Sequence, residues 1–277
     1  MALTEFQRTV CRLISSSRIE QGESYIAGGT ALNAFTGGSR ISQDIDSFHD
    51  TEEALEKTWD ADRKVLESDF NVELIRERAG FVEAVISRGS DSVVMQWARD
   101  SAYRFFPLVE HDDFGLTLHP FDLATNKVLA LVGRLEVRDW VDVITCDRSI
   151  QPMGYLAWAA CGKDPGFCPT MILEHAARSS HYSADEVAEL SFEGSPPDAG
   201  ELAREWRQIL QDSNEVVASL PAVDVGRCAM TSEVGLYKGK ASQISTALTA
   251  GVLQFHSGCI KGAYPSIIES GPVGRQF

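Results

Sequence analysis

The chain has 277 residues, of which 44% are hydrophobic and 23% are charged, which is typical of a folded protein with one large or two modest domains rather than a disordered one. Its longest apolar runs, such as residues 155–161, are too short to span a membrane, and the N-terminus lacks the basic and apolar segments of a secretory signal. The net charge of −15 argues against a broad basic surface for nucleic acid, but it allows a local basic patch and suits a basic partner.

The first half of the sequence alternates between helical and extended patterns. Residues 3–21 carry apolar side chains at helical spacing, and Thr4 stands where an N-cap is expected. Turn-forming residues, glycine above all, separate the later runs. The expected helices are 3–21, 31–35 and 51–68, and the expected extended runs are 25–27, 41–48, 71–76, 81–87, 92–97 and 114–119.

The second half becomes helical after Pro120, apart from a connector rich in proline, glycine and serine at residues 191–200. The expected helices are 121–135, 138–147, 154–161, 169–179, 201–220 and 241–254. We therefore expect an α+β (α/β) fold. Residues 1–118 would form a core with an N-terminal helix and a small mixed β-sheet flanked by helices, and residues 119–277 a mainly helical C-terminal domain.

A glycine-rich turn stands in the stretch from Tyr25 to His49. Gly28, Gly29 and Thr30 separate a short strand from a helix, and glycines let backbone amides approach a phosphate closely. The N-terminus of the helix would add a favourable dipole for an anion. An ordinary strand-to-helix turn has the same pattern, so the glycines alone do not decide between the two.

Two aspartates follow on the next expected strand. Residues two apart project from the same face of a strand, so Asp44 and Asp46 aim at one point while Ile45 faces the core. Aspartate is depleted in strands, and a divalent cation relieves the repulsion between two close carboxylates. The pattern predicts a site for a hard cation such as Mg²⁺, with two solvated carboxylates on an edge strand as the alternative.

A second group of charged residues lies in the helical half. Lys127 and Arg134 share one helix face about 10 Å apart, a spacing that lets both reach a triphosphate. Asp139 and Asp142 share a face of the following helix. The alternative is a solvent-facing lattice of ion pairs, in which Arg134 and Arg138 meet these two aspartates. Lys127 stands in an otherwise apolar stretch, which favours a functional position.

Three motifs occur in order: GGTAL, the R-x-S-x-D-x-D run that contains Arg40 and Ser42, and DLATNKVLALVGRLEVRDWVDV, with a lysine-bearing helix before R-D-x-x-D. They resemble the signature of the minimal nucleotidyltransferases of the DNA polymerase beta type. More narrowly, they resemble the AbiEii/AbiGii-like nucleotidyltransferases, the toxin halves of some bacterial toxin–antitoxin pairs. The rest of the C-terminal half matches no motif of this kind.

The resemblance implies a Mg²⁺-dependent enzyme that transfers a nucleoside monophosphate from an NTP to an acceptor hydroxyl. It suggests a tRNA 3′ end as acceptor and a cognate antitoxin protein as partner. Asp139 or Asp142 would orient the cations or assist the acceptor. The implied residues are Gly28, Gly29, Thr30, Arg40, Ser42, Lys127 and Arg134 for the nucleotide, Asp44 and Asp46 for the metal, and Asp44, Asp46, Lys127 and Asp139 for catalysis.

The sequence departs from the family pattern at the third carboxylate, which such enzymes place on a later strand. The matching strand here offers Gln96, which can ligate through its carbonyl oxygen but cannot act as a base. Asp100, Asp122 or Asp139 would have to substitute, or the third ligand is absent. The activation of the acceptor hydroxyl is the step that this change affects.

Three other functions stay open. The chain could nucleotidylate a small molecule or a protein, which its acidity favours over RNA, or it could be a nucleotide-binding regulator without activity, or a structural partner in a complex. The six cysteines are scattered without C-x-x-C pairs, so we expect reduced thiols and a cytoplasmic protein without disulfides or zinc.

Overall fold

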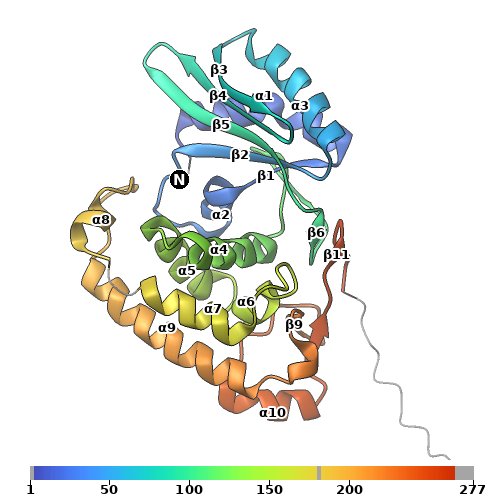
Figure 1. Cartoon of the computed structure of the whole chain (residues 1–277), viewed down its shortest axis with the longest axis vertical. Helices are drawn as coiled ribbons and strands as arrows, with labels where there is room; N and C mark the ends of the chain where they lie inside the picture. Colours follow the sequence, from blue (N-terminus) through green and yellow to red (C-terminus); the bar gives the residue numbers. More distant parts are fainter. Residues whose placement is uncertain (1–2, 180–181, 266–277) are drawn as a thin grey trace, which may run out of the picture.

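The structure, a computed structural model, describes residues 3–179 and 182–265, and its upper part is a seven-stranded mixed sheet (Figure 1). The strand order is β3-β4-β5-β2-β1-β8-β7, in which β2 pairs with β5 and β1 with β8 in parallel. The other neighbours are antiparallel. The strands are β1 (Ser24–Ala27), β2 (Asp44–His49), β3 (Asn71–Arg78), β4 (Phe81–Arg88), β5 (Asp91–Arg99), β7 (Val109–His111) and β8 (Gly115–Thr117).

Helices cover both faces of this sheet. Helices α1 (Glu5–Gln21) and α3 (Glu52–Leu66) pack on one face, and α2 (Gly28–Thr36) lies on the other, between the sheet and α4 (Pro120–Arg134) (Figure 1). Thr4 caps α1 as expected, because its side chain accepts a hydrogen bond from the Gln7 backbone while the Gln7 side chain accepts one from Thr4. The predicted mixed sheet flanked by helices is confirmed.

The second half is mainly helical, and the long helix α9 lies along its outer side (Figure 1). One apolar core is continuous from the sheet into these helices, and a smaller cluster joins α6, α9 and α10 around Trp158. The elements are α5 (Val137–Ser149), α6 (Met153–Ala160), α7 (Pro169–Ala176), η1 (Ala177–Ser179), α8 (Ala184–Ala188), α9 (Ala199–Ser219), η2 (Ala222–Asp224) and α10 (Ala241–Thr249). No helix of the described residues is long and apolar enough to cross a membrane.

Several of the expected elements have other bounds in the structure, and two of these differences affect the pairing of strands. The helix expected at 241–254 stops at Thr249, because Gly251 adopts a left-handed conformation, and β10 (Leu253–His256) then pairs with β9 (Cys228–Thr231). The strand expected at 41–48 begins only at Asp44. Residues 40 and 41 pair instead with the connector, as in the hydrogen bond of 2.8 Å from the Ile41 amide to the Ser191 carbonyl.

The C-terminal part also returns to the sheet half. Strand β11 (Cys259–Ile260) pairs with β6 (Tyr103–Arg104), so residues 253–262, which we call the C-terminal arm, lie against the segment that follows β5. Neither short strand has a sequence pattern that predicts it. Residues 180–181 and 266–277 of the expected C-terminal domain lie outside the described residues.

Candidate active site

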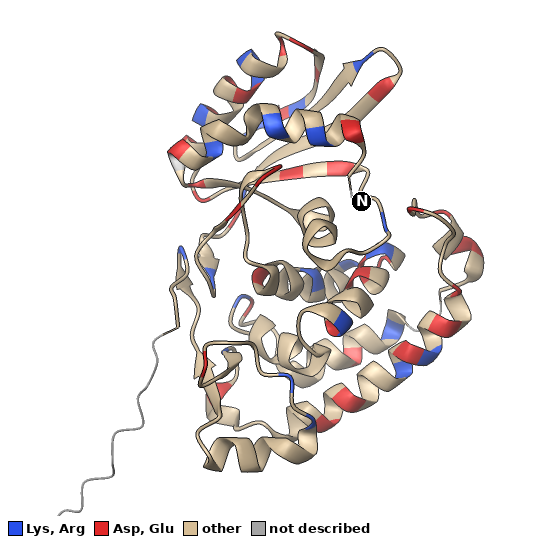
Figure 2. Ribbon diagram, turned by 180° about the vertical axis from the view of Figure 1, so that it is seen from behind, with Lys and Arg blue, Asp and Glu red and all other residues tan. Residues whose placement is uncertain are grey.

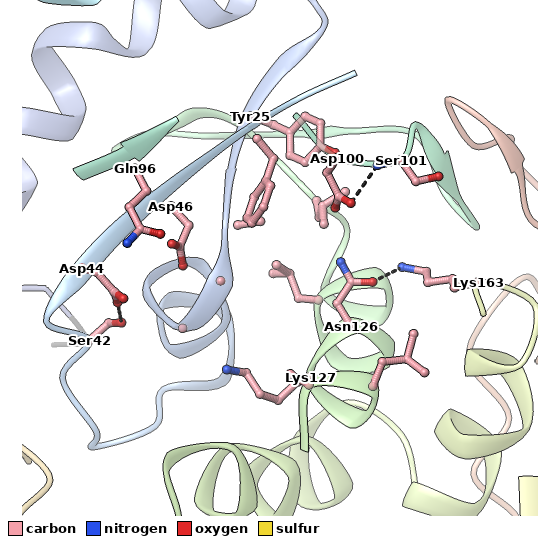
Figure 3. A pocket seen from close by; sticks show the side chains of 18 of the residues that line it. Tyr25, Ser42, Asp44, Asp46, Gln96, Asp100, Ser101, Asn126, Lys127 and Lys163 are labelled. Carbon is pink, nitrogen blue, oxygen red and sulfur yellow. Dashed lines mark hydrogen bonds between the residues drawn. The ribbon is translucent and has the colours of Figure 1, made fainter. Parts of the chain in front are cut away.

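A pocket of about 710 Å³ opens between the sheet and helix α4 (Figure 3). Strands β1 and β2 form one wall, and α4 forms the other. It brings together residues that lie far apart in sequence: Tyr25, Ala27, Gly28, Gly29, Arg40, Ser42, Asp44, Asp46, Phe48, Gln96, Asp100, Ser101, Tyr103, Leu118, Leu123, Asn126, Lys127, Leu129, Ala130, Arg134, Arg138, Lys163 and Asp164. Most of the residues predicted for a site from the sequence therefore share one cavity.

The glycine turn lies directly against two charged side chains. Gly28 has a φ of 68°, and a Cβ atom on it would stand 1.9 Å from the Asp46 Oδ2 atom. A Cβ on Gly29 would stand 2.5 Å from the Arg40 guanidinium and 2.9 Å from the Ser42 hydroxyl. The absence of side chains at this turn is therefore a steric requirement of the pocket.

Strand β2 presents the two aspartates as its alternation predicts. Ile45 is completely buried on the opposite face, whereas Asp44 and Asp46 both line the pocket (Figure 3). The Ser42 hydroxyl donates a hydrogen bond of 2.9 Å to Asp44 Oδ1. Thr30 does not line the pocket, since its buried hydroxyl donates to the Asp44 carbonyl oxygen at 2.6 Å. Thr30 fixes the strand that carries the aspartates.

The Asp46 carboxylate lacks a direct hydrogen-bond partner among the described residues. Burial raises the pKa of Asp46 to about 6, and the nearby Asp44 carboxylate adds to this rise, while the cations across the pocket oppose it. A half-buried carboxylate beside a second one is the situation that a bound cation relieves.

The third position of the aspartate cluster is held by an amide. Gln96 on β5 is paired with Asp46 on β2, and its Nε2 atom donates a hydrogen bond of 2.8 Å to Glu83 Oε1. The amide oxygen of Gln96 lies on the side of Asp46 (Figure 3). Within residues 3–179 and 182–265, no group of three His, Cys, Asp or Glu side chains is placed to hold a metal ion.

Two buried aspartates, Asp139 and Asp142, hold three of the cations that line the pocket. Lys127 Nζ donates to Asp139 Oδ1 at 3.0 Å and lies 3.1 Å from Asp142 Oδ2. Arg134 forms a double hydrogen bond with Asp139 at 2.6 and 2.9 Å, and Arg40 forms one with Asp142 at 2.7 and 2.8 Å. This cluster therefore carries one net positive charge next to Asp46.

The cation cluster differs from the solvent-facing lattice that the sequence left open. Asp139 and Asp142 are at most 1% exposed and do not line the pocket. Burial lowers the pKa of Lys127, but the charges of the two aspartates outweigh it, so the net pKa is raised and the ammonium is retained. Arg138 meets neither aspartate: its closest carboxylates are Glu136 at 2.5 Å and Asp44 at 3.8 Å.

The far end of the pocket contains residues that the sequence reasoning missed. Lys163 Nζ donates hydrogen bonds to Asn126 Oδ1 at 2.7 Å and to the Asp122 carbonyl oxygen at 3.1 Å, and it lies 2.8 Å from Asp122 Oδ1. The ring of Tyr103 completes this end, and the C-terminal arm covers it, since a Cβ on Gly258 would stand 2.6 Å from the ring. Asn126 lies on the same face of α4 as Ala130 and Arg134, so the helical period could have placed it at the pocket. No pattern in the sequence indicates that Lys163 lies there.

The charges of the molecule are unevenly placed. Acidic residues are spaced along the outer helix α9, consistent with the net charge of −15 (Figure 2). The cations at the pocket come from the loop before β2, from α4, from α5 and from the loop after α6. Carboxylates accompany these cations: four aspartates line the same pocket, and Asp122, Asp139 and Asp142 pair with the cations from behind, so the pocket gathers charges of both signs rather than a basic patch.

No protein-family model matches the sequence, and no curated protein matches it. The structure is similar to a candidate nucleotidyltransferase from Helicobacter pylori, with a TM-score of 0.53, 14% identity, and coverage of 78% of this chain and 96% of the other. It is similar to JHP933 from H. pylori, with a TM-score of 0.51, 14% identity, and coverage of 78% and 95%. The nucleotidyltransferase toxin MenT4 from Mycobacterium tuberculosis overlaps less, with a TM-score of 0.38, 14% identity, and coverage of 74% and 91%.

Proposed function

The chain has the fold of H. pylori proteins that include a candidate nucleotidyltransferase, and we propose that it transfers a nucleoside monophosphate from an NTP to an acceptor hydroxyl with the help of Mg²⁺. One observation carries the proposal. An aspartate pair without hydrogen-bond compensation at Asp46 faces a buried cation cluster across a single pocket that also contains a glycine turn. A metal-bound triphosphate has the charges that complement both sides.

The glycine turn and the cation cluster would hold the phosphates. Gly28 and Gly29 open α2, and backbone N–H groups at a helix N-terminus favour an anion. Lys127 and Arg134 stand opposite this turn and would offset the charge of the departing pyrophosphate. Arg40 and Ser42 flank the turn, where they would contact the terminal phosphates.

The donor set fits Mg²⁺. Asp44 and Asp46 supply two carboxylates, and Gln96 supplies an amide oxygen held in place by Glu83. All are hard oxygen ligands, and two carboxylates with substrate phosphates are the usual ligands of this ion. When bound, Mg²⁺ would neutralise charge on the triphosphate and polarise the phosphorus that is attacked.

The reaction is an exchange of one bond at the α-phosphorus. The acceptor oxygen forms a bond to this phosphorus, the bond to the bridging oxygen breaks, pyrophosphate leaves, and the hydroxyl proton passes to a carboxylate of the aspartate pair. Asp139 and Asp142 lie behind the cations and do not line the pocket, so we assign them the role of positioning residues.

The finer assignments rest on the sequence motifs. The AbiEii/AbiGii-like pattern supports a cytoplasmic toxin that modifies a tRNA 3′ end and has a cognate antitoxin protein. The cations that line the pocket are compatible with RNA, whereas the net charge of −15 favours a small-molecule or protein acceptor. These alternatives differ in the acceptor and share the pocket chemistry.

A labelling experiment tests the proposal. The protein is incubated with each α-labelled NTP, Mg²⁺ and total RNA or cell extract, beside Asp44→Ala and, as a control, Asp60→Ala on the exposed side of α3. We expect label to enter one class of acceptor with the wild type and the control, and not with Asp44→Ala. Label that enters equally with Asp44→Ala would refute the role of the aspartates.

A second function is favoured by Gln96, which cannot act as a base. A nucleotide-binding regulator would bind an NTP in calorimetry yet transfer no label to any acceptor. A purely structural role would show neither NTP nor Mg²⁺ binding. The same preparations therefore distinguish the three functions.

A further inference from the structure

We propose that Asn126, held in a single orientation by Lys163, selects the nucleobase at the end of the pocket remote from the aspartates. It favours bases with a carbonyl oxygen at the exocyclic position of the pairing edge, so UTP is preferred to CTP and GTP to ATP. This inference rests on the proposed function, because it assigns the specificity of the same nucleotide pocket.

Lys163 has no hydrogen-bonding capacity left for a ligand. An ammonium group has three donors. Its Nζ atom is met by three acceptors: Asn126 Oδ1 at 2.7 Å, the Asp122 carbonyl oxygen at 3.1 Å and Asp122 Oδ1 at 2.8 Å. The side chain is 8% exposed. Lys163 is therefore a positioning residue that acts through Asn126.

The contact with Lys163 also decides which way the Asn126 amide faces. An ammonium cannot accept a hydrogen bond, so only the amide oxygen can face it. The nitrogen Nδ2 must then face the other way, toward the pocket, as Figure 3 shows. Asp122 in turn is fixed by the backbone amides of Phe105 and Phe106, at 2.9 and 3.0 Å, so the whole group is anchored.

The position along the pocket assigns this amide to the base rather than to the phosphates. Along β2 the pocket wall passes from Asp44 and Asp46 to Phe48, and along α4 it passes from Arg134 and Lys127 to Asn126. A nucleotide whose phosphates lie at the glycine turn and the cations extends from there toward Phe48 and Asn126. Aromatic side chains and a single fixed amide are typical of a base-binding end.

A fixed donor distinguishes bases by their exocyclic groups. Uracil O4 and guanine O6 accept from an N–H group, whereas the amino groups of cytosine and adenine at that position oppose it with a second donor. The two-point contact that a free asparagine makes with adenine also needs its oxygen, which here is turned toward Lys163. One such hydrogen bond gives a preference of about 3- to 10-fold.

Calorimetry with the full chain tests the inference, using UTP against CTP and GTP against ATP in the presence of Mg²⁺. Comparison within each pair keeps the size of the base constant. Asn126→Asp keeps an oxygen for Lys163 and replaces the donor by an acceptor, so we expect the preference of both pairs to weaken or reverse. Asn214→Asp on the exposed face of α9 adds the same charge and should leave the preferences unchanged.

Lys163→Met provides a second variant that frees the amide to rotate. It should reduce the preference within each pair while NTP binding persists. Equal affinities within both pairs for the wild type, or preferences unaltered in Asn126→Asp, would overturn the role of Asn126 and leave the proposed function intact. No binding of any NTP by the wild type would instead refute the proposed function and this inference together.

Discussion

The charge of Asp46 opposes folding, so Asp46→Asn should stabilise the metal-free protein. Burial and the Asp44 carboxylate raise its pKa from 3.8 to about 6. Each tenfold change in proton affinity is worth about 1.36 kcal/mol, so the rise corresponds to about 3 kcal/mol. Since Asp46 is partly exposed to solvent, screening reduces this, and we expect a gain of about 1–3 kcal/mol at pH 7.5.

The dependence on pH has a definite sign. Because the pKa is higher in the folded than in the unfolded state, the unfolded chain releases this proton first as the pH rises. The favourable contribution of the neutral carboxyl is complete below about pH 3.8 and is lost as the pH rises through about 6. The difference in stability between Asp46→Asn and the wild type should therefore be small at pH 4 and largest above pH 7.

Urea unfolding followed by circular dichroism, in EDTA at pH 4.5, 6 and 7.5, measures this difference. Asp60→Asn, on the exposed side of α3, controls for the loss of one negative charge. Addition of Mg²⁺ should stabilise the wild type and not Asp46→Asn. A variant that is equally or less stable than the wild type at pH 7.5 in EDTA would refute the view that Asp46 is strained by its charge.

Three further substitutions test other parts of the pocket. Gly28→Ala should abolish NTP binding and destabilise the protein in urea by more than Gly37→Ala does. Gly37 has a similar positive φ, but an added Cβ there meets no atom within 4 Å, so its replacement should cost about 1 kcal/mol of stability. Equal costs would contradict the steric role of Gly28. Asp142→Asn should lower the free energy of unfolding by about 3–5 kcal/mol because it leaves the buried Arg40 unpaired. Lys127→Met should lower it by only about 1 kcal/mol, since each aspartate keeps an arginine, and yet it should end label transfer. A Lys127→Met protein with wild-type transfer would rule out the catalytic role of Lys127. Gln96→Glu introduces a third carboxylate and, made together with Glu83→Gln so that the contact of 2.8 Å keeps a donor, should tighten Mg²⁺ binding measured by calorimetry; weaker or unchanged binding in the double variant would show that this side chain does not face the cation.

The local parts of the site follow from the sequence because their determinants are local. Alternation along β2 determines which way Asp44 and Asp46 point. The neighbouring strand β5 then places Gln96 beside Asp46. The helical period likewise places Lys127 and Arg134 on one stripe of α4. In these cases one backbone period determines the direction of the side chain.

The connections between distant segments do not follow from the sequence. Arg40 meets Asp142 across 102 residues, and Lys163 meets Asn126 across 37, and no periodicity encodes either contact. The sequence patterns also did not predict the end of α10 or the strands β6, β7, β9, β10 and β11, for a related reason. Such short strands exist only because a partner strand is supplied from elsewhere in the chain.

The C-terminal arm has a consequence for the order of events during synthesis. His256 Nε2 lies 2.7 Å from the carbonyl oxygen of Phe105, across 151 residues, and Gly258 lies on the ring of Tyr103. A ribosome adds about 5–20 residues per second, so the arm emerges roughly 8–30 s after the wall that it covers. The sheet and α4 can pack before then, but the end of the pocket at Tyr103 stays open to solvent. A nascent chain would thus form the two walls of the pocket well before the arm closes its far end.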